Sequence, residues 1–136
     1  THNVSSAASD VYKRQVEALP GPTALIPALV ASGMPSDRFI FEGFLPLKKG
    51  RKSRITEWLN EKRTIVFYES PHRLLRCLNE MQSILGESRD ICIAREISKL
   101  HETYHRGTIG EMLIFFSENE ARGEIVIIIS GKDEKI

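Results

Sequence analysis

The sequence of 136 residues lacks several features that would assign it to a class directly. No apolar run approaches the roughly 18 residues that a membrane-spanning helix needs. The N-terminus has no basic start, apolar stretch and small-residue cleavage site, which together mark a secretory signal peptide. Neither a P-loop nor a Gly-x-Gly-x-x-Gly motif is present, so the common phosphate-binding signatures are missing. These absences favour a cytoplasmic protein with no membrane partner.

Cysteine and histidine are too sparse and scattered for a disulfide framework or a zinc site. Cys77 and Cys92 form no Cys-x-x-Cys pair and fall in an amphipathic helix pattern and an apolar strand pattern. We therefore expect buried free thiols. His101 and His105 are separated by an extended-looking stretch, which would turn their side chains away from one another. No metal site is predicted.

Charge of one sign is not in excess either. The formal net charge is +1, from 19 Lys and Arg against 18 Asp and Glu, so the overall balance says nothing about nucleic acid. Locally, a loop is predicted at residues 45–53, and five of the seven residues 48–54 are basic. Such a stretch is typical either of a contact to RNA phosphates or of an ordinary solvated loop. The candidate phosphate ligands are Lys48, Lys49, Arg51, Lys52 and Arg54.

Apolar periodicity predicts an α/β fold with about five strands in a mixed sheet covered by helices. Strands are predicted at Arg38–Phe44, Thr64–Tyr68, Ile91–Ala94, Thr103–Arg106 and Glu124–Ser130, and the pattern at Val16–Leu19 is that of a short strand end. Helices are predicted at Thr23–Ala31, at Ile55–Lys62, from Pro71 to Leu85 and from Thr108 to about Glu118. Several strand cores are apolar on both faces, which indicates that helices cover both sides of the sheet.

Residues 1–15 carry no periodic pattern and are rich in Ser and Ala. We predict that they form an unstructured or non-native tail. Residues 16–136 are then one α/β domain, which is long enough to bury a single core.

Polar residues come directly after two of the predicted strands. Glu69, His72 and Arg73 follow one strand, and a charged run at residues 94–102 follows another. Ligands in open α/β sheets bind outside the carboxyl ends of strands, so both clusters would line one edge if the strands are parallel. In the alternative, Ser70-Pro71 only caps a helix and the charged run is a surface loop.

A Pro-Gly turn at residues 20–24 precedes the first predicted helix. Gly21 lets the backbone approach a ligand, and Thr23 offers a hydroxyl beside the free N–H groups of the helix start. Such a turn can hold a carboxylate or a ribose. Pro-Gly turns are also common as plain connections between a strand and a helix, so both interpretations stay open.

Taken in order, eight segments resemble the ribosomal RNA small subunit methyltransferase I family, which belongs to a tetrapyrrole-methylase-like class. The string Tyr68–Arg73 is the most specific of them, and the resemblance extends from Val16 to Gly131. The segments are residues 19–25, 31–35, 41–46, 67–74, 94–96, 99–102, 106–108 and 123–126.

The resemblance implies two α/β lobes that enclose S-adenosylmethionine, a homodimer, and methylation of the ribose 2′-oxygen of a cytidine in small-subunit ribosomal RNA. The RNA or the 30S subunit would then be the partner. Residues 48–54 and Arg73 would contact RNA phosphates. The implied cofactor-binding residues are Pro20, Gly21, Pro22, Thr23, Ala24, Phe67, Tyr68 and Glu69.

Methyl transfer to a 2′-hydroxyl requires that the hydroxyl proton be stabilised or removed. A carboxylate, an imidazole or a cation within hydrogen-bond reach would help. The sequence does not rank one of the available groups as the base. The candidates are Glu69, His72, Arg95, Glu96 and Lys99.

One departure from the family matters. Its N-terminal lobe carries a Gly-Thr-Pro-x-Gly-Asn-Leu motif, and nothing in this sequence matches that motif. We therefore expect a C-terminal lobe that is inactive alone. Two other functions stay open, namely a tetrapyrrole methyltransferase of the same fold and a non-catalytic RNA-binding module. Residues 48–54, which we call the basic segment, and the string at residues 69–73 argue against the tetrapyrrole substrate.

Overall fold

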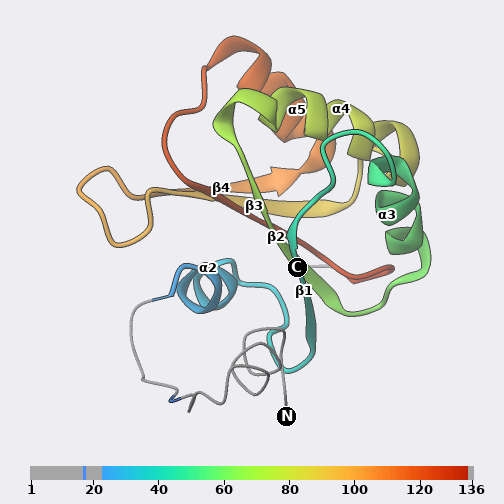
Figure 1. Ribbon diagram of the computed structural model, residues 1–136, viewed down its shortest axis with the longest axis horizontal. Coiled ribbons are helices and arrows are strands. Elements are labelled where there is room, and N and C mark those ends of the chain that lie inside the picture. The colour runs from blue at the N-terminus through green and yellow to red at the C-terminus, as the bar shows by residue number, and fades with distance from the viewer. Residues whose placement is uncertain (1–16, 18–22, 135–136) are drawn as a thin grey trace, which may run out of the picture.

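The structure is a computed structural model that describes residue 17 and residues 23–134 (Figure 1). The predicted strand end at residues 16–19 and the predicted tail therefore fall almost wholly outside the described residues. None of the helices in the described residues is long and apolar enough to cross a membrane. The elements are α2 (Leu25–Ala31), β1 (Phe39–Phe44), α3 (Arg51–Glu57), the 3₁₀ helix η1 (Trp58–Asn60), β2 (Thr64–Glu69), the 3₁₀ helix η2 (Pro71–Arg73), α4 (Leu74–Leu85), β3 (Asp90–Arg95), β4 (Thr103–Thr108), α5 (Ile109–Glu118) and β5 (Ile125–Ile129).

The strands form one mixed sheet of five strands in the order β1-β2-β5-β3-β4, which confirms the predicted α/β fold. β1 is parallel to β2, whereas β5 is antiparallel to both β2 and β3. β2 and β3 therefore run in the same direction and end at the same edge. Glu69 and Arg95 both pair with Ile125, one from each side. We call this edge, where the two polar clusters meet, the rim.

The sheet is covered on both faces, as its apolar strands predicted. The helices α3, α4 and α5 pack on one face, and α2 packs on the other (Figure 1). β5 shows the alternation: Ile125, Ile127 and Ile129 belong to the first core, and Val126 and Ile128 to the second. Burying each such side chain contributes about 1.5–3 kcal/mol, so this strand anchors both layers.

Local sequence signals explain most helix ends. α2 begins at Leu25, slightly later than predicted, so Pro27 falls in the first turn, where its missing N–H loses no helical hydrogen bond. The hydroxyl of Ser70 accepts a hydrogen bond from the N–H of His72 at 3.3 Å and caps η2, which leads into α4. The hydroxyl of Thr108 accepts one from the N–H of Glu111 at 3.2 Å and caps α5.

The predicted loop at residues 45–53 is wrong in its second half. α3 begins at Arg51, directly after Gly50, whose φ of +87° ends the loop. The basic segment is therefore part loop and part helix. The physical reason is tertiary, because the side chain of Arg51 is buried beneath the segment and holds the first helical turn in place.

Candidate functional site

A pocket of about 650 Å³ opens at the rim. We call it the rim pocket. It brings Ala24, at the end of the Pro-Gly turn, together with the predicted cluster after β2 and with Glu96 after β3. Its lining residues are Ala24, Phe44, Tyr68, Glu69, Ser70, Pro71, Glu96, Lys99, Gly123, Glu124, Ile125 and Val126.

Not every predicted cofactor-binding residue takes part in this lining. Pro20, Gly21 and Pro22 lie outside the described residues, and Thr23 is exposed beside Ala24. Phe67 does not face the rim pocket. It is buried in the opposite core, with its ring 5.1 Å from that of Trp58. Because successive side chains of a strand point to opposite faces, Phe67 packs in one core while Tyr68 packs against the other.

One wall of the rim pocket is aromatic. Phe41 and Phe44 would face opposite sides of a regular strand. The pairing of β1 with β2 shifts between Phe41 and Gly43, and Gly43 has a φ of +64°. Both phenylalanine rings consequently lie against Tyr68, with centroids 5.2 Å and 5.4 Å away. Such a wall offers an apolar surface against which a ligand ring can pack.

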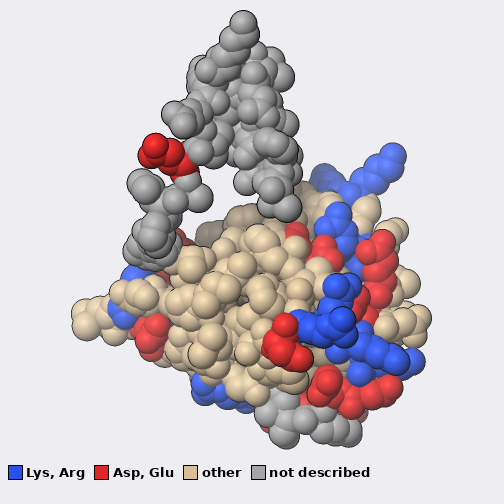
Figure 2. All heavy atoms as spheres, turned by 90° about the horizontal axis from the view of Figure 1, so that it is seen from below, with Lys and Arg blue, Asp and Glu red and all other residues tan. Residues whose placement is uncertain are grey.

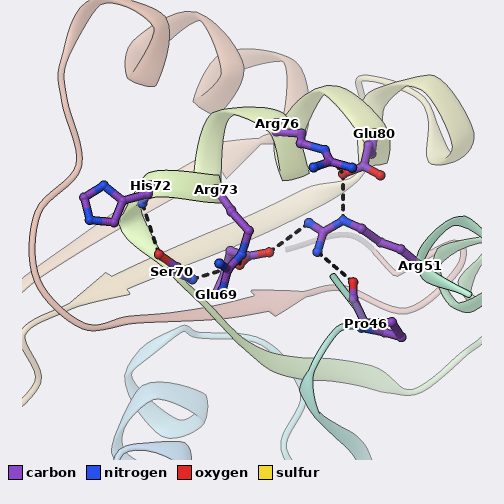
Figure 3. A network of polar contacts seen from close by, with 8 residues as sticks. All are labelled: Pro46, Arg51, Glu69, Ser70, His72, Arg73, Arg76 and Glu80. Atoms are coloured by element: carbon purple, nitrogen blue, oxygen red, sulfur yellow. Dashed lines mark hydrogen bonds and ion pairs between the residues drawn. The ribbon is translucent and has the colours of Figure 1, made fainter. Parts of the chain in front are cut away.

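The carboxylate of Glu69 is buried at the base of this wall and is held by several donors (Figure 3). Its Oε2 accepts a hydrogen bond from Arg51 at 2.8 Å. Its Oε1 accepts from the N–H of Ser70 at 2.8 Å and from Nε of Arg73 at 3.1 Å. Because these internal donors occupy both oxygens, the geometry favours a structural role for Glu69 over the predicted role of proton acceptor.

Arg51 was a predicted phosphate ligand, and that prediction is wrong. Its side chain is 1% exposed, and its guanidinium contacts Glu69 at 2.8 Å, Glu80 at 2.7 Å and the carbonyl of Pro46 at 3.3 Å. Burial alone would lower the pKa of Arg51, but the hydrogen bonds that Arg51 donates to Glu69 and Glu80 raise it. Its charge is directed inward and is not presented to RNA.

The other basic residues of the segment remain at the surface. Lys48, Lys49 and Lys52 are exposed. Arg54 is partly exposed and forms an ion pair with Glu42 at 2.7 Å. The prediction of phosphate contacts therefore rests mainly on the three lysines.

His72 and Arg73 diverge from one another after β2. The imidazole of His72 points away from Glu69 in Figure 3, and His72 lines a separate hollow with Phe116 and Glu118. Arg73 is partly exposed and pairs with Glu69. The structure therefore does not bring His72 into the rim pocket with Glu69, Glu96 and Lys99.

Arg95 and Glu96 are adjacent at the end of β3, but only Glu96 lines the rim pocket. Nε and an Nη of Arg95 donate to the carbonyl of Arg122 at 2.9 Å and 2.6 Å. The Oε1 atom of Glu96 accepts from the N–H of Glu124 at 2.6 Å. This bond lowers the pKa of Glu96 against a smaller effect of burial, and Lys99 adds to the lowering. Arg95 tethers a turn outside the pocket, whereas Glu96 lies in the lining.

Lys99 and Gly123 also line the rim pocket. Nζ of Lys99 lies 3.4 Å from Glu96 and 3.5 Å from Glu124. Burial alone would lower the pKa of Lys99, but the two carboxylates raise it. A Cβ on Gly123 would lie 1.8 Å from Oε1 of Glu96. Sequence reasoning missed the role of Gly123, although an isolated glycine before a strand often marks a close approach.

Comparison with known proteins places these features in a family context. The sequence profile of the family described as Tetrapyrrole (Corrin/Porphyrin) Methylases matches residues 3–113. Ribosomal RNA small subunit methyltransferase I of Escherichia coli O157:H7 is 50% identical over 120 residues, which cover 86% of this chain and 42% of that protein. The protein of the same name from Thermotoga maritima is 44% identical over 119 residues, covering 88% and 53%. These relatives confirm the resemblance predicted from the sequence segments, and this chain spans about half of their length.

Solved structures support the same fold. A cobalt precorrin-4 methyltransferase of cobalamin biosynthesis has a TM-score of 0.66 at 18% identity, covering 91% of this chain and 55% of that chain. Uroporphyrin-III C-methyl transferase from Thermus thermophilus, complexed with S-adenosyl homocysteine, has a TM-score of 0.60 at 18% identity, covering 90% and 55%. At these identities the likeness shows a shared fold.

Proposed function

We propose, because this chain belongs to the tetrapyrrole methylase family, that it forms the C-terminal lobe of an S-adenosylmethionine-dependent methyltransferase. The proposed reaction is methylation of the ribose 2′-oxygen of a cytidine in small-subunit ribosomal RNA. The observation that carries the proposal is the rim pocket, in which Ala24 and residues 68–71 meet as the family resemblance requires. The names of the relatives at 44–50% identity support ribosomal RNA as the substrate.

The rim pocket suits one side of a nucleoside cofactor. It combines apolar side chains, among them Tyr68 and Val126, with a few polar groups at Ser70 and Glu96, which is the usual composition of a small-molecule site. Ala24, Tyr68 and Ser70 are the described residues that we expect to hold S-adenosylmethionine. When bound, the cofactor supplies an activated methyl group, so positioning is the main task left to the protein.

The described residues of the rim are better suited to hold and orient ligands than to remove a proton. The oxygens of Glu69 are occupied by Arg51, Arg73 and the backbone. The pKa of Glu96 is lowered, which makes it a weaker base near neutral pH. We therefore assign these carboxylates a positioning role in the proposed reaction.

The acceptor RNA would approach from the side of α3. Lys48, Lys49 and Lys52 are exposed there and would contact phosphates, with Arg73 beside the rim. Phosphate contacts position an RNA without reading its sequence. Selection of RNA over DNA would come from the 2′-hydroxyl, which is also the proposed acceptor.

The proposal is tested on the complete protein that contains this chain. Methyl transfer from labelled S-adenosylmethionine is measured with 30S subunits and with a uroporphyrinogen as acceptors. We expect label in the RNA only. Label in the tetrapyrrole only would establish the small-molecule alternative. RNA binding without affinity for S-adenosylhomocysteine would establish the non-catalytic module.

A variant in the rim pocket tests its assignment to the cofactor. We expect Tyr68→Ala to raise the Kd for S-adenosylhomocysteine about tenfold or more, a loss of about 1.4 kcal/mol, because the aromatic wall collapses. Phe115→Ala is the matched control, since it removes an aromatic ring on α5 away from the rim pocket. An equal loss of affinity in both variants, measured by calorimetry, would refute the assignment.

We further propose that residues 1–136 alone do not transfer methyl groups. The relatives are about twice as long as this chain, and the rim pocket would form one wall of a cleft completed by the rest of the protein. The test compares turnover by the 136-residue chain with turnover by the complete protein. A normal rate from the chain alone would contradict this proposal.

We also propose a homodimer as the working assembly. Large apolar side chains are exposed on α2, on β1 and in the loop after β1. The face shown in Figure 2 bears few charges in its middle. Exposed apolar surface is typical of interaction sites when it is extensive. The exposed apolar residues are Ile26, Val30, Phe41, Phe44 and Leu47.

A further inference from the structure

The basic segment contains one side chain that behaves unlike its neighbours. Lys48, Lys49 and Lys52 are exposed, whereas Arg51 is turned inward and is 1% exposed. All three nitrogens of its guanidinium make contacts: Nη2 with Glu69 at 2.8 Å, Nε with Glu80 at 2.7 Å and Nη1 with a backbone carbonyl at 3.3 Å. Figure 3 shows the guanidinium at the centre of this network.

The partners of Arg51 belong to three different parts of the fold. The carbonyl is that of Pro46, in the loop that leads to the lysines. Glu80 lies on α4, and Glu69 ends β2. The N–H of Ser70 donates to the same Glu69 carboxylate at 2.8 Å. A single guanidinium thus connects the segment that carries the lysines to the wall of the rim pocket.

Stability alone gives little reason for this arrangement. Buried ion pairs contribute weakly to stability, and well-packed apolar residues often replace them without loss. Geometry gives a better reason. The guanidinium is a rigid planar fork that holds several acceptors in fixed directions, whereas the ammonium of lysine is a point charge on a flexible chain.

Taking the proposed function as given, we propose that Arg51 is a positioning residue that sets the lysines of residues 48–52 in register with the Tyr68–Ser70 wall of the rim pocket. The lysines hold the RNA backbone and the wall holds the methyl donor. Arg51 fixes the distance between the two, and therefore aligns the ribose oxygen with the donor. Misplacement by about 1 Å can cost about 100-fold in rate.

The test uses Arg51→Lys in the complete protein, with Arg63→Lys as the matched control. Both arginines pair with carboxylates, but Arg63 lies just before β2, contacts Glu61 at 2.9 Å and belongs neither to residues 48–54 nor to the lining of the rim pocket. We expect Arg51→Lys to lower kcat for RNA about 10- to 100-fold. The KM for RNA and the Kd for S-adenosylhomocysteine should change less than about threefold, because the lysines and the pocket residues remain. The control should stay within about twofold of the wild type in all three quantities.

Hydrogen exchange gives a readout that does not depend on methyl transfer. In Arg51→Lys we expect the amides of residues 48–52 and 68–70 to exchange faster together, and in Arg63→Lys neither segment should change. If the wild type methylates no RNA but this coupled exchange is seen, the proposed function is wrong, whereas the coupling of the two segments through Arg51 is supported. If neither segment changes in Arg51→Lys, that coupling is refuted.

A second variant guards against misfolding. Glu80→Gln weakens the hold on Arg51 from α4 without altering any lining residue of the rim pocket. We expect a smaller loss of kcat, again with little change in the KM for RNA. Unchanged kcat in Glu80→Gln and Arg51→Lys, or a parallel loss of kcat and of both binding constants, would overturn the proposal.

Discussion

At Gly123 the backbone has a φ of +81°, and the space that a Cβ would need is occupied by the carboxylate of Glu96. We predict that Gly123→Ala lowers the free energy of unfolding by about 2–4 kcal/mol, because the left-handed backbone costs about 1–2 kcal/mol and displacement of Glu96 adds the loss of a charged hydrogen bond. Urea denaturation followed by the fluorescence of Trp58, the single tryptophan of the chain, measures it.

Gly33→Ala is the control for this prediction. Gly33 has a nearly identical φ of +79°, but no heavy atom lies within 4 Å of the Cβ position. Gly33→Ala should therefore lower the free energy of unfolding only by the cost of the left-handed backbone. Equal losses for Gly33→Ala and Gly123→Ala would mean that the contact with Glu96 contributes nothing.

Cys92 gives a prediction about pH. Burial raises the pKa of this thiol to about 11 against a smaller opposing effect of Arg106. In the unfolded chain the thiol ionises near its ordinary pKa of 9.0. The stability from the protonated thiol is therefore fully present below about pH 9 and is lost as the pH rises to about 11. We predict that Cys92→Ala flattens the fall in unfolding free energy over this range.

The measurement is a series of urea denaturations between pH 7 and pH 11 for the wild type and Cys92→Ala. The cavity left by the smaller side chain lowers stability equally at every pH, so only the slope is informative. Parallel profiles for the two proteins would contradict the prediction.

At the scale of the elements, the start of α5 depends on one hydroxyl. Oγ of Thr108 accepts from the N–H of Glu111 at 3.2 Å and lies 3.1 Å from the Glu111 carboxylate. We predict that Thr108→Ala costs about 1 kcal/mol of unfolding free energy, since the first turn loses its cap. Thr108→Ser keeps the hydroxyl and should cost less than half as much. A loss of the same size in Thr108→Ser would show that the methyl group, and not the cap, matters.

α3 shows where an element escapes local rules. Its first turn carries basic residues and no capping side chain, which is why the sequence suggested a loop through Ser53. The contacts of Arg51 with Glu69 and Glu80 come from segments distant in the sequence. Helix propensity and capping signals are local, so they could not locate this start.

At the scale of the whole molecule, the apolar face around α2 and β1 predicts self-association. We expect Val30→Lys to weaken the proposed homodimer of the complete protein at least tenfold, because a charge buried in an apolar interface is costly. Ile114→Lys is the control: Ile114 lies on α5 and is 66% exposed, against 67% for Val30. Sedimentation velocity over a dilution series measures the dissociation constant.

Two results would reject this prediction. The first is a complete protein that is monomeric at all concentrations, which would mean that another part of the same chain covers the face. The second is an equal weakening of the dimer by Val30→Lys and Ile114→Lys, which would place the interface elsewhere. The second result would leave the dimer itself intact as a proposal.

The sequence by itself determined the elements and much of their chemistry. The strand patterns at Thr64–Tyr68 and Ile125–Ile129 predicted strands buried on both faces, and the Thr108 and Ser70 signals predicted helix starts. These are properties of neighbouring residues, which is why a pattern can read them. Ala24, from one family segment, lines the rim pocket with residues 68–71 from another, whereas His72 does not.

Only the tertiary structure decided what each polar side chain does. β5 is inserted between β2 and β3, and this antiparallel insertion brings Glu69 and Arg95 to one edge. Whether an arginine faces solvent or a buried carboxylate depends on that packing, and so Arg51 and Lys52 have opposite environments although they are adjacent. Burial and partners arise from contacts between distant segments, and no local pattern records them.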